Sequence, residues 1–331
     1  MRVLAHIHTF NDADIIDQTI DAVRRQTRPV DAILIVDNAS TDGTLDRPAV
    51  KHAKVLRHPT NLGTSGAILT GMRFALDHDY DWIWVFDADS SPDPDALERL
   101  LDLYTDLPQS LRDETACLAC LPFHQFDGRP LHGSILTRSG RIVVSPAPKE
   151  RYYAIHVTVW TGSLYRMAAV RKSGFPNPDY VLDMGEYEYG HRMTKAGYKS
   201  FMHQDAVIKH QIRGTRSLRR VVLKLGPLAI TFYEDPPIRC YYLCRNMLYF
   251  TLYDCREGRI GLLGTVAWAF RSVLWRVCLV PGRSSLKPGV AWQLLMFTLN
   301  FLVRPRNHGE QIAACFRGIW HGVTGNITAR Y

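Results

Sequence analysis

The chain has 331 residues, of which 46% are hydrophobic and 22% are charged, and its formal net charge is +8. These globular values exclude a largely disordered chain, and the length suffices for one large domain or two ordinary ones. The charge is uneven. Residues 1–215 carry 24 Lys and Arg against 27 Asp and Glu, net −3, whereas residues 216–331 carry 16 against 5, net +11. The C-terminal third therefore suits an anionic partner, either lipid headgroups or nucleic acid.

Apolar strands and helices alternate over the first third of the chain. Hydrophobic periodicity predicts strands at 3–9, 32–36, 54–57 and 82–86, and helices at 11–25, 63–76 and 94–104. This alternation is typical of an α/β fold with a parallel sheet. After residue 107 the pattern loosens, and the Gly-, Pro- and Ser-rich stretch 123–151 indicates a mobile loop with some edge strand. Order returns at 155–165, helices are expected at 166–173 and 186–196, and a final strand is expected at 206–210.

The cysteines indicate thiols rather than a metal site. There are 7, an odd number, and they are scattered; Cys117 and Cys120 lie within an apolar run. No second pair lies at the spacing of a zinc ribbon, so we expect buried thiols and a reducing compartment. The N-terminus enters a strand at once without an apolar signal segment, which favours the cytoplasm.

The apolar stretches at 260–270 and 290–303 are interleaved with aromatic and basic residues. The longer one falls short of the roughly 20 apolar residues that a membrane-spanning helix needs. We expect helices in the membrane interface, with basic side chains at the headgroups, namely Arg271, Arg276, Arg304 and Arg306. The alternative is a helical subdomain packed on the α/β core. The interleaving favours lipid over nucleic acid.

Polar clusters follow the ends of the first four expected strands. They are Thr9-Phe10-Asn11, Asp37-Asn38, Asn61-Leu62-Gly63 and Asp87-Ala88-Asp89. Ligands of open α/β sheets bind outside the carboxyl ends of the strands, so the clusters predict one binding edge. For any single Asp after a strand, a helix cap is the simpler interpretation.

The Asp87-Ala88-Asp89 triplet carries the most chemistry. In an extended chain both carboxylates point to the same side, and they repel unless a cation or hydrogen bonds offset the repulsion. Carboxylate oxygens suit Mg²⁺ or Mn²⁺, which bridge to substrate phosphates and neutralise a diphosphate leaving group. The triplet therefore predicts a metal site for a nucleotide-sugar. His210 is a candidate further ligand of the metal, although a lone His more often has a structural role.

A second acidic cluster contains Asp183, Glu186 and Glu188. Glu186, at the start of a predicted helix, is a candidate general base towards a sugar hydroxyl; the alternative is an acid that complements the helix dipole. Glu188 and Arg192 have the spacing of an ion pair on one helix face. A separate segment, Trp160-Thr161-Gly162, offers an aromatic face to an acceptor sugar ring, with core packing of Trp160 as the alternative.

These motifs in this order resemble the family-2 glycosyltransferases with a GT-A fold, in particular the rhamnosyltransferase and galactofuranosyltransferase branch. The resemblance covers residues 1–215 and includes, besides the clusters above, Gln26-Thr27, residues 36–44 and 81–89, Glu186 to Tyr189, and Gly197-Tyr198. It implies a GT-A domain over 1–215 and a helical, membrane-associating region over 216–331.

The resemblance also implies roles for individual residues. Those implied to bind the donor are Thr9, Asn11, Asp37, Asn38, Asn61, Gly63, Asp87 and Ala88. Asp89 and His210, with Asp87 beside them, would hold the metal. The family's base is usually the first acid of an Asp-x-Glu motif; Glu186 stands there in this chain, and Asp183 is the competitor. Glu188 and Arg192 would shape the acceptor site.

The implied function is inverting, metal-dependent transfer from a donor such as dTDP-rhamnose or UDP-galactofuranose. The acceptor would be a glycan or a lipid-linked saccharide, at the inner face of the cell membrane, in the assembly of a surface polysaccharide. The sequence leaves the oligomeric state open. Three alternatives remain. A haloacid-dehalogenase-type phosphatase usually has Thr or Val where Ser91 stands, a nucleotidylyltransferase needs a Gly-rich loop that His6 to Thr9 lacks, and the third is an inactive membrane-bound scaffold.

Overall fold

The computed structural model describes residues 1–123, 128, 130–136, 142–144, 150–210, 219–225, 228–234, 236–254 and 308–331. The chain divides into two compact units. The first is Met1–Val181 with Gly185–Arg213, and the second is Leu182–Met184 with Gly214–Tyr331. The stretches 260–270 and 290–303, and the four arginines expected at the headgroups, lie outside the described residues.

The described part of the first unit is built on one mixed sheet of nine strands, in the order β3-β2-β1-β4-β10-β6-β11-β5, with β9 paired to β11. The strands are β1 Val3–Thr9, β2 Ala32–Asp37, β3 Lys54–Arg57, β4 Trp82–Asp87, β5 Ser90–Pro92, β6 Thr115–Phe123, β9 Tyr152–Ile155, β10 Ser163–Arg166 and β11 Lys199–His210. As predicted, β3, β2, β1 and β4 are parallel. The sheet is not parallel throughout, because β10 runs antiparallel to β4 and β6, and β5 and β9 run antiparallel to β11.

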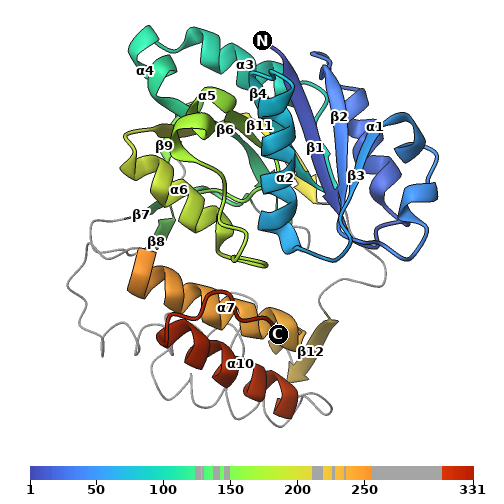
Figure 1. Ribbon diagram of the computed structural model, residues 1–331, viewed down its shortest axis with the longest axis vertical. Helices are drawn as coiled ribbons and strands as arrows, with labels where there is room; N and C mark the ends of the chain where they lie inside the picture. The colour runs from blue at the N-terminus through green and yellow to red at the C-terminus, as the bar shows by residue number, and fades with distance from the viewer. Residues whose placement is uncertain are drawn as a thin grey trace. The chain divides into compact units, whose positions relative to one another are not determined.

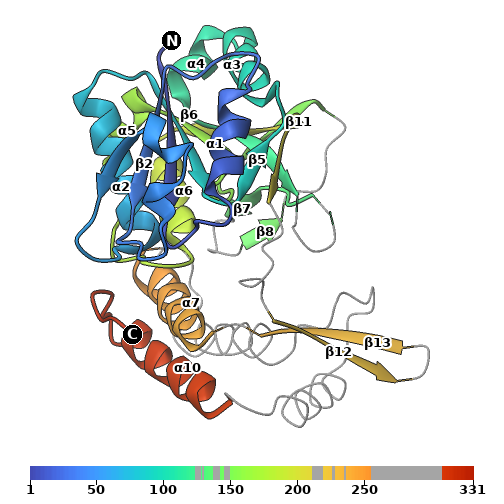
Figure 2. The same ribbon diagram turned by 90° about the vertical axis from the view of Figure 1, so that its right-hand side faces the viewer.

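Helices cover both faces of this sheet (Figure 1 and Figure 2). They are α1 Ile16–Arg24, α2 Gly63–Asp77, α3 Ala96–Asp106, α4 Gln109–Glu114, α5 Met167–Ser173 and α6 Gly185–Lys195, with short 3-10 turns η1 Thr44–Asp46 and η2 Val50–His52. Alternate residues of β4 point to opposite faces of the sheet and pack into two different hydrophobic cores. Trp82, Trp84 and Phe86 pack with α1 and α3, whereas Ile83 and Val85 pack with α2, α5 and α6. Burial on both faces explains why the strand is continuously apolar.

Three sequence expectations are corrected. The helix expected from residue 11 begins at Ile16, because the residues before it form a loop in which Asn11 has a φ of 56°. The strand β6 is central although the pattern loosens after residue 107; its buried run includes Cys117 and Cys120. As expected these are buried thiols, and burial raises the pKa of Cys117 to about 12. Of the ordered segment expected at 155–165, only Ile155, the end of β9, and residues 163–165, in β10, are strand.

Two smaller parts complete the described fold. Within the stretch expected as a loop, β7 Ser134–Leu136 pairs with β8 Ile142–Val144. In the second unit, β12 Arg219–Leu225 and β13 Leu228–Glu234 form a hairpin. None of the described helices has both the length and the apolar character that a membrane span requires.

Two helices of the second unit, α7 Pro237–Tyr249 and α10 His308–Val323, lie side by side (Figure 1 and Figure 2). A π-helical turn, η3 Phe250–Asp254, follows α7. Glycines allow the close approach. A Cβ at Gly318 would lie 2.4 Å from the carbonyl oxygen of Tyr241, and one at Gly322 would lie 2.7 Å from that of Arg245. Any larger side chain at these two positions would push the helices apart.

A histidine is enclosed beneath α2. His6 of β1 is fully buried, and it fits because Gly71 of α2 has no side chain: a Cβ there would lie 2.3 Å from His6 Nδ1. Neither ring nitrogen has a hydrogen-bond partner in the described structure. Burial, followed by the nearby His8 ring, lowers the pKa of His6 well below its ordinary value, and Asp87 opposes this only partly. His6 is therefore neutral in the folded protein.

We predict that the free energy of unfolding decreases as the pH falls below about 6.5, the ordinary pKa of histidine. The unfolded chain then binds a proton at His6 that the folded chain does not bind, so stability present above this pH is lost as the pH falls towards the folded pKa. Burial lowers the pKa of His58 and His203 as well, which gives the same sign. Denaturant unfolding at about pH 7.5 and about pH 5.5 measures the effect.

The replacement His6→Val should make this loss smaller, whereas His52→Val, at an exposed position, should leave it unchanged. An equal loss in His6→Val and the wild type would show that His6 is not responsible.

Candidate active site

The first three predicted clusters and the Asp87 triplet meet at one edge of the sheet. In register, Thr9 is opposite Asp37, Asp37 is opposite Arg57, and His8 is opposite Asp87. The four parallel strands thus end at the same level. The loops that follow them come together at the carboxyl edge, where α/β folds bind their ligands.

The loop after β1 is fixed by Asp12, a residue that the sequence analysis did not select. Its buried carboxylate accepts hydrogen bonds from Thr9 Oγ1 (2.8 Å) and from the backbone N–H of Phe10 (3.0 Å). Asn11 then connects this loop to the one after β2. Its N–H donates to Ser40 Oγ at 2.8 Å, and its Oδ1 accepts from the N–H of Thr41 at 2.7 Å. Thr9 therefore supports the first loop, and Asn11 connects the two loops.

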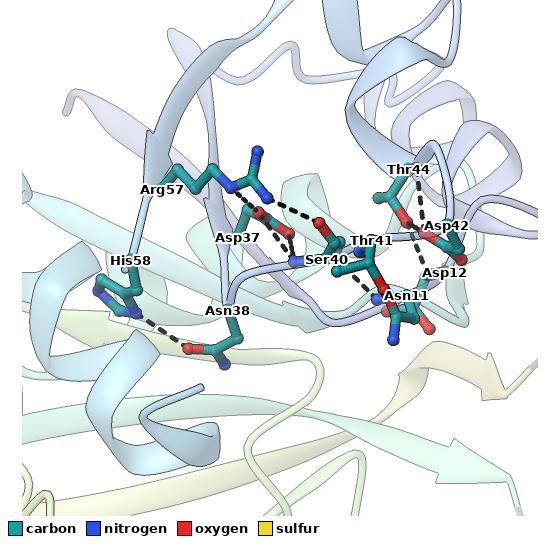
Figure 3. A network of polar contacts seen from close by, with 10 residues as sticks. All are labelled: Asn11, Asp12, Asp37, Asn38, Ser40, Thr41, Asp42, Thr44, Arg57 and His58. Carbon is teal, nitrogen blue, oxygen red and sulfur yellow. Dashed lines mark hydrogen bonds and ion pairs between the residues drawn. The ribbon is translucent and has the colours of Figure 1, made fainter. Parts of the chain in front are cut away.

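Asp37 ends β2 and stabilises the turn that follows (Figure 3). Both its carboxylate oxygens accept from the N–H of Ser40 at 3.2 Å, and Oδ2 lies 3.3 Å from Arg57 Nε. Arg57 also donates to the carbonyl oxygen of Ser40 at 2.8 Å. The Asp37 side chain has no exposed surface, whereas Arg57 is 54% exposed. The charge accessible at this position is thus the guanidinium, which the sequence analysis missed.

Asn38 connects β2 to the loop at residues 61–63. Its Oδ1 accepts from the N–H of Leu62 at 3.3 Å, and its Nδ2 donates to the carbonyl oxygen of Gly63 at 3.2 Å. The His58 ring lies between Asn38 Oδ1 and Thr70 Oγ1, 2.9 Å from each (Figure 3 shows the Asn38 contact). Because Asn38 Oδ1 can only accept, His58 Nδ1 carries the hydrogen in this pair.

Gly63 begins α2 in a conformation that no other residue would adopt easily. Its φ is +75°, and a Cβ there would lie 2.1 Å from the carbonyl oxygen of Val181. Val181 also accepts a hydrogen bond from the N–H of Thr64 at 2.9 Å. The loop at residues 61–63 therefore lies directly against the chain that leads to the second acidic cluster.

Asp87 is oriented by a histidine that the sequence analysis missed. His8 Nε2 lies 2.8 Å from Asp87 Oδ1, and the Asp87 side chain keeps 35% of its surface exposed. The backbone N–H of Asp87 donates to Thr161 Oγ1 at 3.3 Å, and Thr161 donates to Ser90 Oγ at 2.7 Å. The next residue, Ala88, is buried, and its carbonyl oxygen accepts from Thr19 Oγ1 at 2.7 Å. The triplet is thus a fixed turn.

The side chains at this turn offer oxygen ligands of the kind that a hard divalent cation prefers. Asp87 and Asp89 supply carboxylate oxygens, and His210 pairs in register with Ser90, the neighbour of Asp89. The side chain of His210 lies outside the described part of the structure, and the described side chains contain no group of three or more metal ligands. The carboxylates and the backbone register fit the expected site, while the place of the histidine ring in it stays a prediction.

The second acidic cluster separates into three environments. Glu186 lies half-buried in the first turn of α6. Glu188 is buried and pairs with Arg192, with 2.6 Å between Arg192 Nε and Glu188 Oε1. Arg192 also donates to the carbonyl oxygens of Ser173 and Phe175, at 2.5 Å and 2.8 Å. The predicted ion pair therefore exists, and it attaches α6 to the segment after α5.

Asp183 belongs to the second unit and is paired there. Its carboxylate lies 3.2 and 3.3 Å from the guanidinium nitrogens of Arg239. Asp183 is therefore engaged by a contact within its own unit.

The expectation of an open aromatic face at Trp160 is wrong. The Trp160 ring is 5% exposed and packs against Tyr165 and Tyr189, both 5.8 Å away between ring centroids. Gly162 has a φ of +77°, and a Cβ there would lie 3.0 Å from carbon atoms of Cys120 and Ile208. Trp160, Thr161 and Gly162 thus form a buried turn before β10, as the core-packing alternative holds.

Comparison with known proteins places this site in a family. Residues 5–174 match the model of glycosyl transferase family 2. An undecaprenyl-phosphate mannosyltransferase of Micrococcus luteus is 37% identical over 243 residues, which cover 71% of this chain and 84% of the relative. The chain belongs to glycosyl transferase family 2. It is a glycosyltransferase, and the phosphatase and scaffold alternatives are set aside.

Solved structures show the same GT-A fold. A mannosyltransferase from Pyrobaculum calidifontis in complex with GDP-Man and Mn²⁺ has a TM-score of 0.56 and 16% identity, over 97% of this chain and 86% of that one. GalNAc-T7 with UDP, GalNAc and Mn²⁺ has a TM-score of 0.53 and 14% identity, over 64% of this chain. The match spans only 44% of the GalNAc-T7 chain.

Proposed function

We propose that this protein transfers a hexosyl group, with inversion, from a nucleoside-diphosphate sugar to a hydroxyl of a lipid-linked saccharide. The proposal rests chiefly on one arrangement: the exposed Asp87 carboxylate, oriented by His8, at the edge where the loops after β1 and β2 also end. Such an edge accommodates the nucleoside along the loops and the diphosphate at the carboxylates. dTDP-rhamnose and UDP-galactofuranose are donor candidates from the motifs, and the name of the Micrococcus relative adds a mannose donor.

In this proposal the residues assigned to the nucleotide-sugar donor act mostly by fixing the backbone of the loops around it. Thr9, Asn11, Asp37 and Asn38 fix three loops, and Arg57 offers the exposed charge for an anionic or polar donor group. Asn61 accepts from the N–H of Gly63 at 2.8 Å and so shapes the third loop. Asp87 and Asp89 would hold Mg²⁺ or Mn²⁺, which when bound neutralises charge on the diphosphate.

Glu186 is the base in this proposal. The acceptor oxygen forms a bond to the anomeric carbon as the bond to the diphosphate breaks. The electron pair leaves with the nucleoside diphosphate, and the hydroxyl proton passes to Glu186. A single displacement of this kind inverts the anomeric centre and needs no nucleophilic carboxylate. Glu188 and Arg192 support α6 from behind and thereby shape the acceptor side.

We predict that a nucleotide-sugar with Mn²⁺ or Mg²⁺ raises the melting temperature by about 5–10 °C at roughly 100 times its Kd, since it binds the native state. Removing the metal with EDTA should abolish most of the shift. Asp89→Asn should weaken donor binding at least about tenfold, whereas Asp102→Asn, exposed on α3, should bind as the wild type does. No shift with any nucleotide-sugar would overturn the proposed function.

We predict that Glu186→Gln keeps the donor affinity of the wild type and lowers the rate of transfer about 10²- to 10⁴-fold, because the amide cannot take the hydroxyl proton. Isothermal titration calorimetry and single-turnover transfer separate the two effects. Full transfer by this variant would show that Glu186 is not the base.

The name of the Micrococcus relative supports a second acceptor class, a polyprenyl phosphate. A phosphate monoester is already an anion at pH 7 and needs little help from a base. Its transfer would therefore survive Glu186→Gln, so assaying both acceptor classes with this variant distinguishes them.

Residues of the second unit support the proposal that the protein binds peripherally to an anionic membrane surface. In α10, Phe316 is 61% exposed and Trp320 is 67% exposed, one turn apart, and Arg317 lies exposed beside them. Exposed aromatic rings next to a basic residue suit the boundary between headgroups and acyl chains. The residues from 216 on carry a net charge of +11, which adds attraction to anionic lipid.

We predict that vesicles containing anionic lipid sediment the wild-type protein, and that the double variant Phe316→Ser/Trp320→Ser binds them at least about tenfold more weakly, because two apolar rings no longer enter the interface. Tyr152→Ser, at an exposed aromatic residue of β9, is the matched control. Equal binding by the double variant and the wild type would exclude this face of α10.

A further inference from the structure

The three residues between Val181 and Gly185 adopt a backbone that has to be held in place. Asp183 has a φ of 58° and Met184 a φ of 67°, two consecutive non-glycine residues in the left-handed region. Asp tolerates this region better than most residues, but Met does not, because its Cβ lies too close to the backbone there. The Met184 residue is also buried, with an exposed fraction of 6%. Such a conformation persists only where surrounding contacts enforce it.

The contacts that enforce it come from one face of α7. Arg239 binds the Asp183 carboxylate through two nitrogens, at 3.3 and 3.2 Å. Asn246 Nδ2 donates to two backbone carbonyl oxygens, those of Leu182 (2.7 Å) and Asp183 (2.9 Å). Arg239 and Asn246 are seven residues apart, two helical turns, so they project from the same side. Side chain and backbone of the segment are thus both bound by α7.

Asn246 is itself fixed. It is fully buried, and its Oδ1 accepts from Arg245 Nε at 2.8 Å, which leaves Nδ2 to face the two carbonyl oxygens. Arg245 is also fully buried. It donates to the carbonyl oxygen of Ala329 and lies 4.7 Å over the ring of Tyr242. Burying a guanidinium is costly, and burial lowers its pKa. The cost is understandable if Arg245 serves to orient Asn246.

Both ends of the held segment continue into site residues. Val181 receives the N–H of Thr64 and lies against Gly63. On the other side, Gly185 has no room for a side chain, because a Cβ would lie 2.2 Å from Ser65 Oγ, and Glu186 follows directly in the first turn of α6. A change of backbone conformation at residues 182–184 would therefore shift the position of Glu186.

We infer that Arg239 and Asn246 are positioning residues for the reaction: by holding residues 182–184 in a left-handed conformation, they set the place of the Glu186 carboxylate. This inference rests on the proposed function, in which Glu186 is the base. It gives α7 a task in the chemistry besides any contact with lipid. It also assigns Asp183 an anchoring role, which explains why an acid stands there without serving as the base.

The test compares Arg239→Ala with Arg330→Ala, an exposed arginine of the same unit. Arg239 is 41% exposed in its side chain, so its replacement spares the core. We expect kcat to fall about tenfold, with the Kd of the nucleotide-sugar and the donor KM unchanged, because a small displacement of a reacting group lowers the rate steeply. Arg239→Lys keeps the charge without the two-nitrogen contact, and should recover part of the loss. Asn246→Asp, which presents oxygen to the two carbonyl groups, should lose more, about 100-fold.

A double-mutant cycle with Glu186→Gln separates positioning from general destabilisation. If Arg239 acts through Glu186, Arg239→Ala lowers kcat no further once Glu186 is Gln. Equal fractional losses in both backgrounds, an unchanged kcat in Arg239→Ala, or a loss of donor binding in that variant would each overturn the inference. Wild-type transfer and its loss in Glu186→Gln are measured in the same series, so a failure of the proposed function is recognised separately.

Discussion

The parallel strands β3, β2, β1 and β4 end at one level, and the candidate site depends on this register. Each strand is paired in a defined register, and both faces pack into close-packed cores, so a slip by one residue would exchange side chains between two cores that they do not fit. Because the strands cannot slip, Thr9, Asp37 and Asp87 are brought to the same edge. The polar side chains at this edge are then fixed mainly by hydrogen bonds between the loops.

Most polar residues of this edge bind the protein itself. Asp37 has no exposed surface and Asn38 is almost fully buried, yet both orient backbone groups of neighbouring loops. Under the proposed function, they would contribute to nucleotide binding by fixing backbone hydrogen-bonding groups before the ligand arrives. Asp87 differs: it keeps an exposed surface and a histidine partner, which suits a direct contact with a cation or a sugar.

The acidic residues around α6 show how chemically similar side chains acquire different tasks. Glu188 is paired within its own helix and Asp183 is paired with Arg239, so both are occupied by guanidinium groups. Glu186 lies between them in the sequence, in the first turn of α6. The two left-handed residues before α6, Asp183 and Met184, belong to the second unit, where α7 holds this segment by hydrogen bonds to Asp183.

The sequence by itself determined the family, the first four strands and the cluster at Asp87, because periodicity and short motifs are local properties of the chain. It did not reveal β6, whose apolar run has no helical or alternating period, nor the antiparallel direction of β10, because strand pairing is decided by contacts distant in sequence. Likewise, only the tertiary structure placed the Trp160 ring in the core and His8 beside Asp87. It also separated Asp183 from Glu186, since the partner that occupies Asp183 is 56 residues away in the sequence.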